Sequence, residues 1–143
     1  MNWKEEAAQR LGDYRYMRNA MGSIQRELKR LEKEATALKS LAMDRVCVPN
    51  ATGRKEDRLL NNLVRRQQLS DSLEQVELWL DSTDAALKCL QTEERQILDR
   101  IYIRADWGNA TELAADLGME RSTIYRRRDD ALRKFTVALY GKS

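Results

Sequence analysis

The chain has 143 residues, with 26 Lys or Arg against 23 Asp or Glu, a net charge of +3 and no histidine. Scarce glycine and a single proline favour long helices over sheets, so we expect an all-α fold in one or two small domains. Without histidine the commonest general base is missing, and the chain has no P-loop, GxGxxG or nucleophile elbow. We therefore expect neither an enzyme nor a cofactor.

The cysteines and the N-terminus indicate a location in the cytoplasm. Cys47 and Cys89 lie near opposite ends of a predicted helix, so we expect no disulfide between them, and two unpaired thiols suit a reducing compartment. The chain has no CxxC motif, so we expect no zinc site. The first ten residues, MNWKEEAAQR, lack the apolar core of a signal peptide, and no segment is apolar enough to cross a membrane.

A first long helix is predicted from about Asn2 to Asp44. Apolar residues recur there at alternating steps of three and four, which is a heptad seam; they are Tyr14, Met17, Met21, Ile24, Leu28, Leu31, Ala35, Leu38 and Ala42. Such a helix cannot bury its apolar stripe alone and needs a partner helix. The following VCVPNATG (46–53) contains the turn formers proline, asparagine and glycine, and it predicts a loop.

A second long helix is predicted from about Lys55 to Leu90. Its later part has the seam Leu69, Leu73, Val76, Leu80, Thr83, Leu87 and Leu90. An earlier apolar patch, Leu59, Leu60, Leu63 and Val64, is out of phase with that seam, and the polar residues 65–68 separate the two. This discontinuity predicts a heptad skip, a bend or a change of partner helix.

Residues 1–90 are thus expected to form a long antiparallel helical hairpin, although the first helix could instead pair with its copy in another molecule. A two-helix hairpin has little core, so self-association as a homodimer or higher homo-oligomer is expected in either case. Acidic residues gather in the second helix and could meet a basic protein surface; they are Asp71, Glu74, Glu77, Asp81 and Asp84.

Residues 91–143 are expected to form a small helix-turn-helix domain. The stretch Asn109–Phe135 has a small residue, a turn glycine and a β-branched residue at the spacing of that motif. Ala114 would let the two helices cross closely, Gly118 would take the left-handed conformation that ends the first helix, and Ile124 would fill the angle between them.

The outer face of the second of these helices has the residue types that read the major groove. Arginine binds guanine and phosphate, serine and threonine bind bases or phosphates, and tyrosine offers a hydroxyl and a flat ring. The residues expected to contact bases or nearby phosphates are Arg121, Ser122, Thr123, Tyr125 and Arg126. Three further cations, Arg128, Arg133 and Lys134, would neutralise phosphates.

The stretch Asn109–Phe135 resembles region 4 of sigma-70-type sigma factors, which reads the promoter −35 element. The ending Ala-Leu-Arg-Lys-Phe (131–135) is similar to the Ala-Leu-Arg-Lys-Leu of that family, and the helix beginning Thr-Glu-Glu-Arg (92–95) is similar to the preceding helix of region 4. The resemblance covers about residues 90–140 and implies that Asn109 and Thr111 touch backbone phosphates. The layout of the whole chain is similar to phage-encoded late-transcription regulators of the ArpU/RinA type.

Two residues depart from the sigma pattern. Arg127 stands where an apolar residue is usual, so its stem could lie along the core or the register could be shifted by one. Glu120 stands at the usual Ser or Thr N-cap, and its charge would repel phosphate. Nothing in the chain resembles sigma region 2, which argues against a complete sigma factor.

These observations predict a sequence-specific regulator of transcription that binds double-stranded DNA, encoded by a phage or prophage. The alternative is a protein-interaction adaptor that binds RNA polymerase or a sigma-like partner without a DNA site of its own. A small terminase-like packaging subunit would also join a helix-turn-helix to a coiled coil. In that class, however, the DNA-binding module is normally N-terminal.

Overall fold

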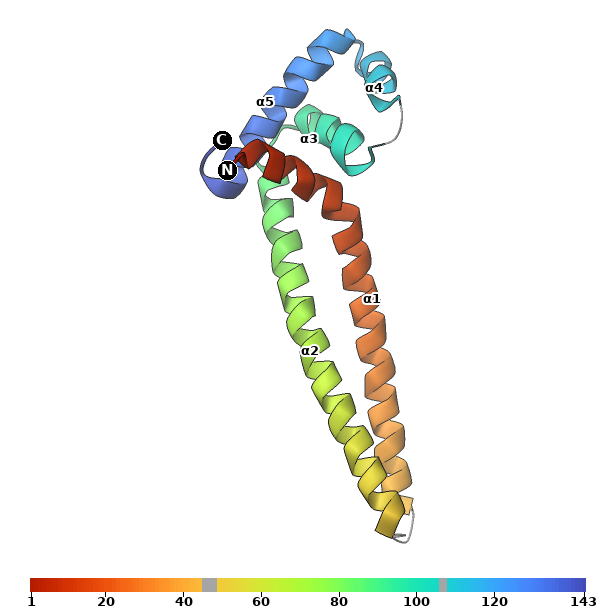
Figure 1. Ribbon diagram of the computed structural model, residues 1–143. Coiled ribbons are helices and arrows are strands. Elements are labelled where there is room, and N and C mark those ends of the chain that lie inside the picture. Colours follow the sequence, from red (N-terminus) through yellow and green to blue (C-terminus); the bar gives the residue numbers. More distant parts are fainter. Residues whose placement is uncertain (45–48, 106–107) are drawn as a thin grey trace. The chain divides into compact units, whose positions relative to one another are not determined.

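A computed structural model describes residues 1–44, 49–105 and 108–143 (Figure 1), with backbone alone at 42–44 and 49–53. Every regular element in these ranges is helical, which confirms the predicted all-α fold class. In order, the elements are α1 (Trp3–Asp44), α2 (Pro49–Lys88), α3 (Thr92–Leu98), the π-helical turn η1 (Asp99–Ile103), α4 (Asn109–Leu117) and α5 (Arg121–Tyr140).

The chain divides into two compact units. One consists of Met1–Arg18 together with Leu78–Ser143, and the other of Asn19–Glu77. Both long helices therefore contribute residues to both units.

In the unit Asn19–Glu77, α1 and α2 run in opposite directions beside each other (Figure 1). The amide nitrogen of Asn62 donates a 2.9 Å hydrogen bond to the Leu31 carbonyl, and Arg65 lies 3.5 Å from the Glu27 carboxylate. The predicted seam of α1 faces this contact, because Leu31 and its seam neighbours Ala35 and Leu38 are all buried.

The seam of α2 continues without a break over residues 59–69, which contradicts the predicted discontinuity there. Leu59 and Arg66 are half-buried and Asn62 is buried, so these residues continue the heptad phase of Leu69. The predicted break came from reading leucines as seam residues, whereas the seam contains polar side chains that are hydrogen-bonded: Arg66 donates to the Asn62 amide oxygen over 2.8 Å.

The second helix begins earlier than predicted. α2 starts at Pro49, so residues 49–53 of the predicted loop are helical. Proline suits this place because the first turn of a helix does not use its backbone N–H groups, and proline has none to lose. The rest of the predicted loop and Cys47 lie outside the described residues.

In the unit Met1–Arg18 with Leu78–Ser143, the ends of the long helices share a core with α3 and α5. Leu11 of α1, Leu98 of α3 and Phe135 of α5 are completely buried in one cluster, which also contains Ala7, Ala86, Leu90, Ala131 and Leu132. The rings of Trp3 and Tyr140 lie 5.0 Å apart, so the first helix also contacts the last turn of α5.

Polar contacts join α1 to α2 within the same unit. The Arg10 guanidinium donates to the hydroxyls of Thr83 and Ser82, each over 2.7 Å, and lies over the Trp79 ring at 4.6 Å. None of the helices in the described ranges combines the length and apolar character needed to cross a membrane.

Candidate nucleic-acid interface

The connection between α4 and α5 is a tight turn made by Gly118, Met119 and Glu120. Gly118 has φ 64° and ψ 36°, the left-handed conformation that was predicted for it. The Met119 N–H donates a 2.9 Å hydrogen bond to the Ala114 carbonyl, which closes the end of α4. Glu120 has an extended backbone and makes no side-chain cap hydrogen bond, so α5 starts at Arg121 without side-chain capping.

A small core holds α4 against α5 and α3. Ile124 is completely buried, and it clusters with Ala114, Leu113 and Ile97. Ala114 of α4 and Ile124 of α5 are thus buried in the same cluster. Because these residues orient the first turns of α5, they determine which of its side chains point outward.

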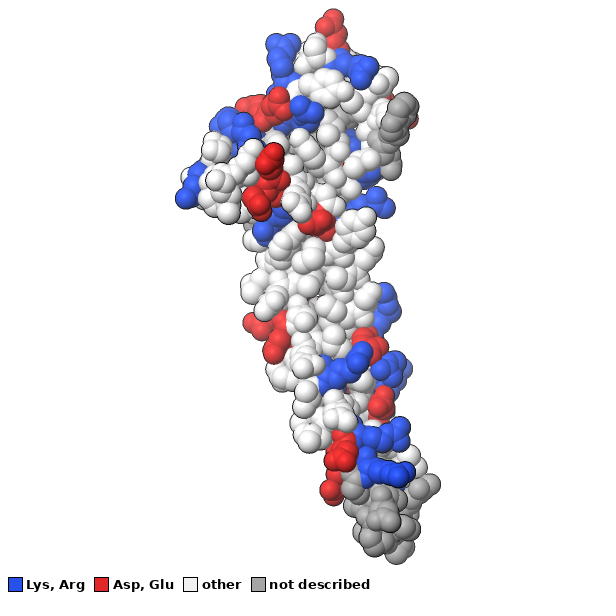
Figure 2. Space-filling view, viewed as in Figure 1, with Lys and Arg blue, Asp and Glu red and all other residues white. Residues whose placement is uncertain are grey.

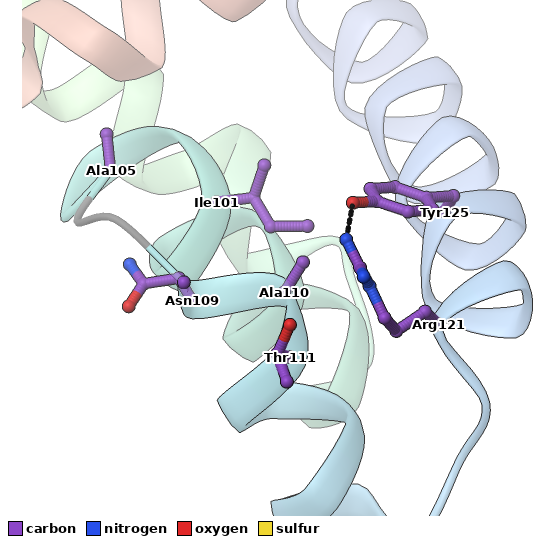
Figure 3. A pocket seen from close by; sticks show the side chains of 8 residues that line it. Ile101, Ala105, Asn109, Ala110, Thr111, Arg121 and Tyr125 are labelled. Carbon is purple, nitrogen blue, oxygen red and sulfur yellow. Dashed lines mark hydrogen bonds between the residues drawn. The ribbon is translucent and has the colours of Figure 1, made fainter.

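The start of α5 presents several of the predicted base-contacting residues to solvent. Arg121, Ser122 and Arg126 are exposed, whereas Thr123 and Tyr125 are half-buried. The Arg121 guanidinium donates a 3.3 Å hydrogen bond to the Tyr125 hydroxyl, which Figure 3 shows. The guanidinium of Arg128 lies over the Tyr125 ring, 5.0 Å from its centre.

A cavity of about 520 Å³ lies between the starts of α4 and α5. Its polar lining comes from Thr111 and Asn109 of α4 and from Arg121 and Tyr125 of α5 (Figure 3). The other lining residues are Ile101, Ala105, Gly108 and Ala110. The cavity thus brings together residues from two predicted groups. Asn109 and Thr111 are implied to contact phosphates, and Arg121 and Tyr125 are predicted to contact bases.

Asn109 and Thr111 differ in how accessible they are. Asn109 is buried and its amide nitrogen donates to the Arg100 carbonyl, so this donor already has a partner within the fold. Thr111 is exposed. Of the two residues that the sigma resemblance assigns to phosphate, the threonine is therefore the one with a side chain open to solvent.

The three cations assigned to phosphate neutralisation all have acidic neighbours. Arg128 pairs with Asp129 at 3.0 Å and Arg133 with Asp130 at 3.1 Å. Lys134 lies 2.8 Å from Glu94 of α3. Hydrogen bonding to Glu94 and then to Asp130 raises the pKa of Lys134 above its ordinary value.

Arg127, the departure from the sigma pattern, contacts α3. Its guanidinium forms an ion pair with Glu93, and the residue as a whole is exposed. Neither this pair nor the Lys134–Glu94 pair was predicted from the sequence. The sequence feature that could have indicated both pairs is the acidic first turn of α3, which contains Glu93 and Glu94. The Glu94 side chain also caps α3, because it accepts a hydrogen bond from the Gln91 N–H.

Ion pairing divides the basic residues of α5 into two groups. Arg121 and Arg126 make no ion pair with any described residue, whereas the cations from Arg127 onward are paired. Figure 2 shows Lys and Arg side chains interspersed with Asp and Glu over the part of this unit that is in view. The two arginines of α5 that have no ion pair with a described residue thus lie in its first turns.

No group of three or more His, Cys, Asp or Glu in the described part of the chain could hold a metal ion. Comparison of the chain with protein-family models, with curated proteins and with solved structures found no match.

Proposed function

We propose that this chain is a sequence-specific regulator of transcription that binds double-stranded DNA, and that it is encoded by a phage or prophage. One observation carries the proposal: α4, the glycine turn and α5 leave Arg121, Ser122 and Arg126 exposed at the start of α5. A helix that enters the major groove contacts base edges with its N-terminal residues. In this proposal, α4–turn–α5 is the helix-turn-helix of a region 4-like DNA-binding domain.

The base-reading set in this proposal is Arg121, Ser122, Thr123, Tyr125 and Arg126, with Thr111 on a phosphate. Arg126 is its centre, because it is exposed and has no ion pair in the described ranges. Arg128, Arg133 and Lys134 give additional phosphate neutralisation when DNA competes with their acidic neighbours. The long helices form the coiled coil through which two copies present two such domains to two half-sites.

The test is a fluorescence anisotropy titration of the full chain with random duplex DNA at two salt concentrations. Binding through several phosphates weakens steeply as salt rises. Selection from a random pool of duplexes then yields the preferred site, which a sequence-specific regulator must have. A folded protein that binds no duplex at either salt concentration would refute the proposal.

The acidic face of α2 favours one competing function, an adaptor that binds RNA polymerase or a sigma-like partner. Asp71, Glu74 and Glu77 are all exposed at spacings that put them on one side of the helix. They would face a basic surface of the partner protein. An adaptor would bind purified RNA polymerase without showing any duplex binding, which separates it from the regulator.

A further inference from the structure

The side chain of Asn109, the first residue of α4, is bonded to the backbone of η1. In a regular α-helix the Arg104 N–H would donate to the Arg100 carbonyl, four residues earlier. It donates instead to the Asp99 carbonyl over 2.8 Å, as in a π-helix. The amide nitrogen of Asn109 donates to the Arg100 carbonyl in its place. The buried Asn109 thus fixes the start of α4 to η1.

The side chain of Arg100 makes a second link between η1 and α4. Its guanidinium lies 3.6 Å from the Glu112 carboxylate and 3.4 Å from the Asp116 carboxylate. These two acids are four residues apart and share one face of α4. Exposed ion pairs contribute little free energy each, so the buried hydrogen bond of Asn109 is the stronger link.

The position of α4 determines where α5 lies. Leu113 and Ala114 of α4 pack with Ile124 of α5 in one buried cluster. Because such clusters are close-packed, a shift of α4 against η1 would also move α5. Arg121 and Arg126 would move with it. Base contacts depend on hydrogen-bond distance and angle, so they are more sensitive to this shift than the attraction of charges to phosphates.

Asn109 and Thr111 differ in direction. In Figure 3 the Asn109 side chain points away from Arg121 and Tyr125. Thr111 is exposed and lines the cavity between the starts of α4 and α5. In the proposed function, a phosphate at the start of α5 would therefore meet the Thr111 hydroxyl, whereas the Asn109 amide faces η1.

We propose that Asn109 and Arg100 are positioning residues for DNA recognition: they hold α4, and through it α5, and Asn109 touches no phosphate. The effect on DNA rests on the proposed function. The hold on α4 is a property of the fold and is measured without DNA.

Amide hydrogen exchange of the full chain, without DNA, tests the hold on α4. Asn109→Ala should speed exchange of the α4 amides roughly tenfold, because the loss of one hydrogen bond lets the helix open more often. Asn109→Asp, which keeps the size of the side chain but cannot donate once ionised, should act in the same direction. Thr111→Ala, the control in the same turn, should not speed exchange, because its side chain is exposed. Unchanged exchange in both Asn109 variants would overturn the proposal.

Two substitutions of Arg100 test the second link by the same exchange measurement. Arg100→Gln should speed exchange of the α4 amides by a smaller factor than Asn109→Ala, because the backbone carbonyl remains. Arg100→Lys can still pair with Glu112 and Asp116, so its exchange should lie closer to that of the wild type. Equal exchange in the two Arg100 variants would overturn the role of this side chain.

The ratio of the affinities for the selected duplex and for random duplex DNA separates positioning from phosphate contact. Asn109→Ala should lower this ratio roughly tenfold, because misplaced base contacts discriminate less. Thr111→Ala should weaken both affinities by a similar factor and leave the ratio unchanged, as the loss of a phosphate contact does. The same uniform loss in Asn109→Ala would overturn the proposal. If the chain binds no duplex, the proposed function fails, and the exchange measurement alone decides whether Asn109 holds α4.

Discussion

Lys134 of α5 donates a 2.8 Å hydrogen bond to the carboxylate of Glu94 on α3. Asp130 lies 3.3 Å from the same ammonium group, so two carboxylates surround a cation that is assigned to phosphate in the proposed function. DNA would have to compete with these internal anions for Lys134. Under the proposed function, the pair would therefore link the stability of the fold to the strength of DNA binding.

Glu94→Gln should strengthen binding to random duplex DNA. Glutamine can still accept the Gln91 N–H in the helix cap, but it removes the charge that competes for Lys134. We expect a severalfold gain in affinity at low salt and a salt dependence steeper by about one phosphate contact. Anisotropy titrations measure both, and Glu32→Gln on the exposed surface of α1 makes the same charge change as a control. Equal effects of the two variants would show that net charge alone is responsible.

Arg126→Ala should weaken binding to the selected DNA site by about 1–3 kcal/mol if Arg126 makes a bidentate base contact. Sequence preference should relax at one position of the site, since a lost base contact no longer discriminates there. The measurement is a titration with the selected duplex and with single-base variants of it. Lys39→Ala, which removes an exposed cation from α1, should change neither quantity. Unaltered affinity and preference in Arg126→Ala would remove this residue from the reading set.

Stability should fall in acid because of Glu94 and Asp130. Burial alone would raise the pKa of Glu94, but hydrogen bonds from Lys134 and the Gln91 N–H lower it below the ordinary 4.5. Hydrogen bonds from Arg133 and then Lys134 lower the pKa of Asp130 below its ordinary 3.8. A carboxylate with a depressed pKa in the folded state stabilises the fold above its unfolded-state pKa, and the stabilisation is lost as pH falls through the folded-state value.

Urea unfolding at neutral pH and at about pH 3 measures this loss. Glu94→Gln should reduce the difference in unfolding free energy between the two pH values, because its amide does not titrate. If the variant and the wild type lose the same stability in acid, the Lys134–Glu94 pair contributes nothing to the pH dependence.

The substitutions Gly118→Ala and Gly12→Ala should change the stability of the fold in opposite directions. Gly118 has φ +64°, which costs an alanine about 1–2 kcal/mol, although a Cβ there would meet no atom within 4 Å. Gly12 lies within α1 where a Cβ likewise meets nothing within 4 Å, so Gly12→Ala should stabilise the fold by about 0.5–1 kcal/mol. Thermal unfolding of both variants checks the signs. Stabilisation by Gly118→Ala would contradict the left-handed turn between α4 and α5.

Phe135→Ala should destabilise the protein by about 3–5 kcal/mol, because Phe135 is completely buried at the centre of the core shared by α1, α3 and α5. Val137→Ala serves as the control on the same helix, since Val137 is 41 % exposed and should cost far less. Urea unfolding followed by circular dichroism compares the two. Similar losses in both variants would contradict the position of Phe135 in the core.

Local sequence signals predicted the elements of the C-terminal region well. Gly118 indicated the turn through its conformational freedom, and Ile124 indicated the buried side of α5 through helical spacing. The exposure of Arg121 and Arg126 followed from the same spacing. These features depend on residues close together in the chain, which is why a single sequence reveals them.

Long-range polar partners could not be predicted in the same way. Asn62 is buried because a carbonyl of α1 accepts its hydrogen, and Arg127 lies on α3 because Glu93 is there. Hydrophobic periodicity carries no information about either partner. The same limitation explains why Leu60 and Leu63, apolar but exposed, were taken as part of a discontinuous seam.

The core shared by the chain's two ends has a consequence for biosynthesis. Leu11 is translated long before Phe135, yet both are completely buried in one cluster, and Trp3 contacts Tyr140. This core cannot close on the ribosome until the last helix has emerged from the exit tunnel. The order of synthesis therefore leaves the first turns of α1 without their native neighbours until α5 has been made, and a ribosome stalled before α5 would carry an incomplete core.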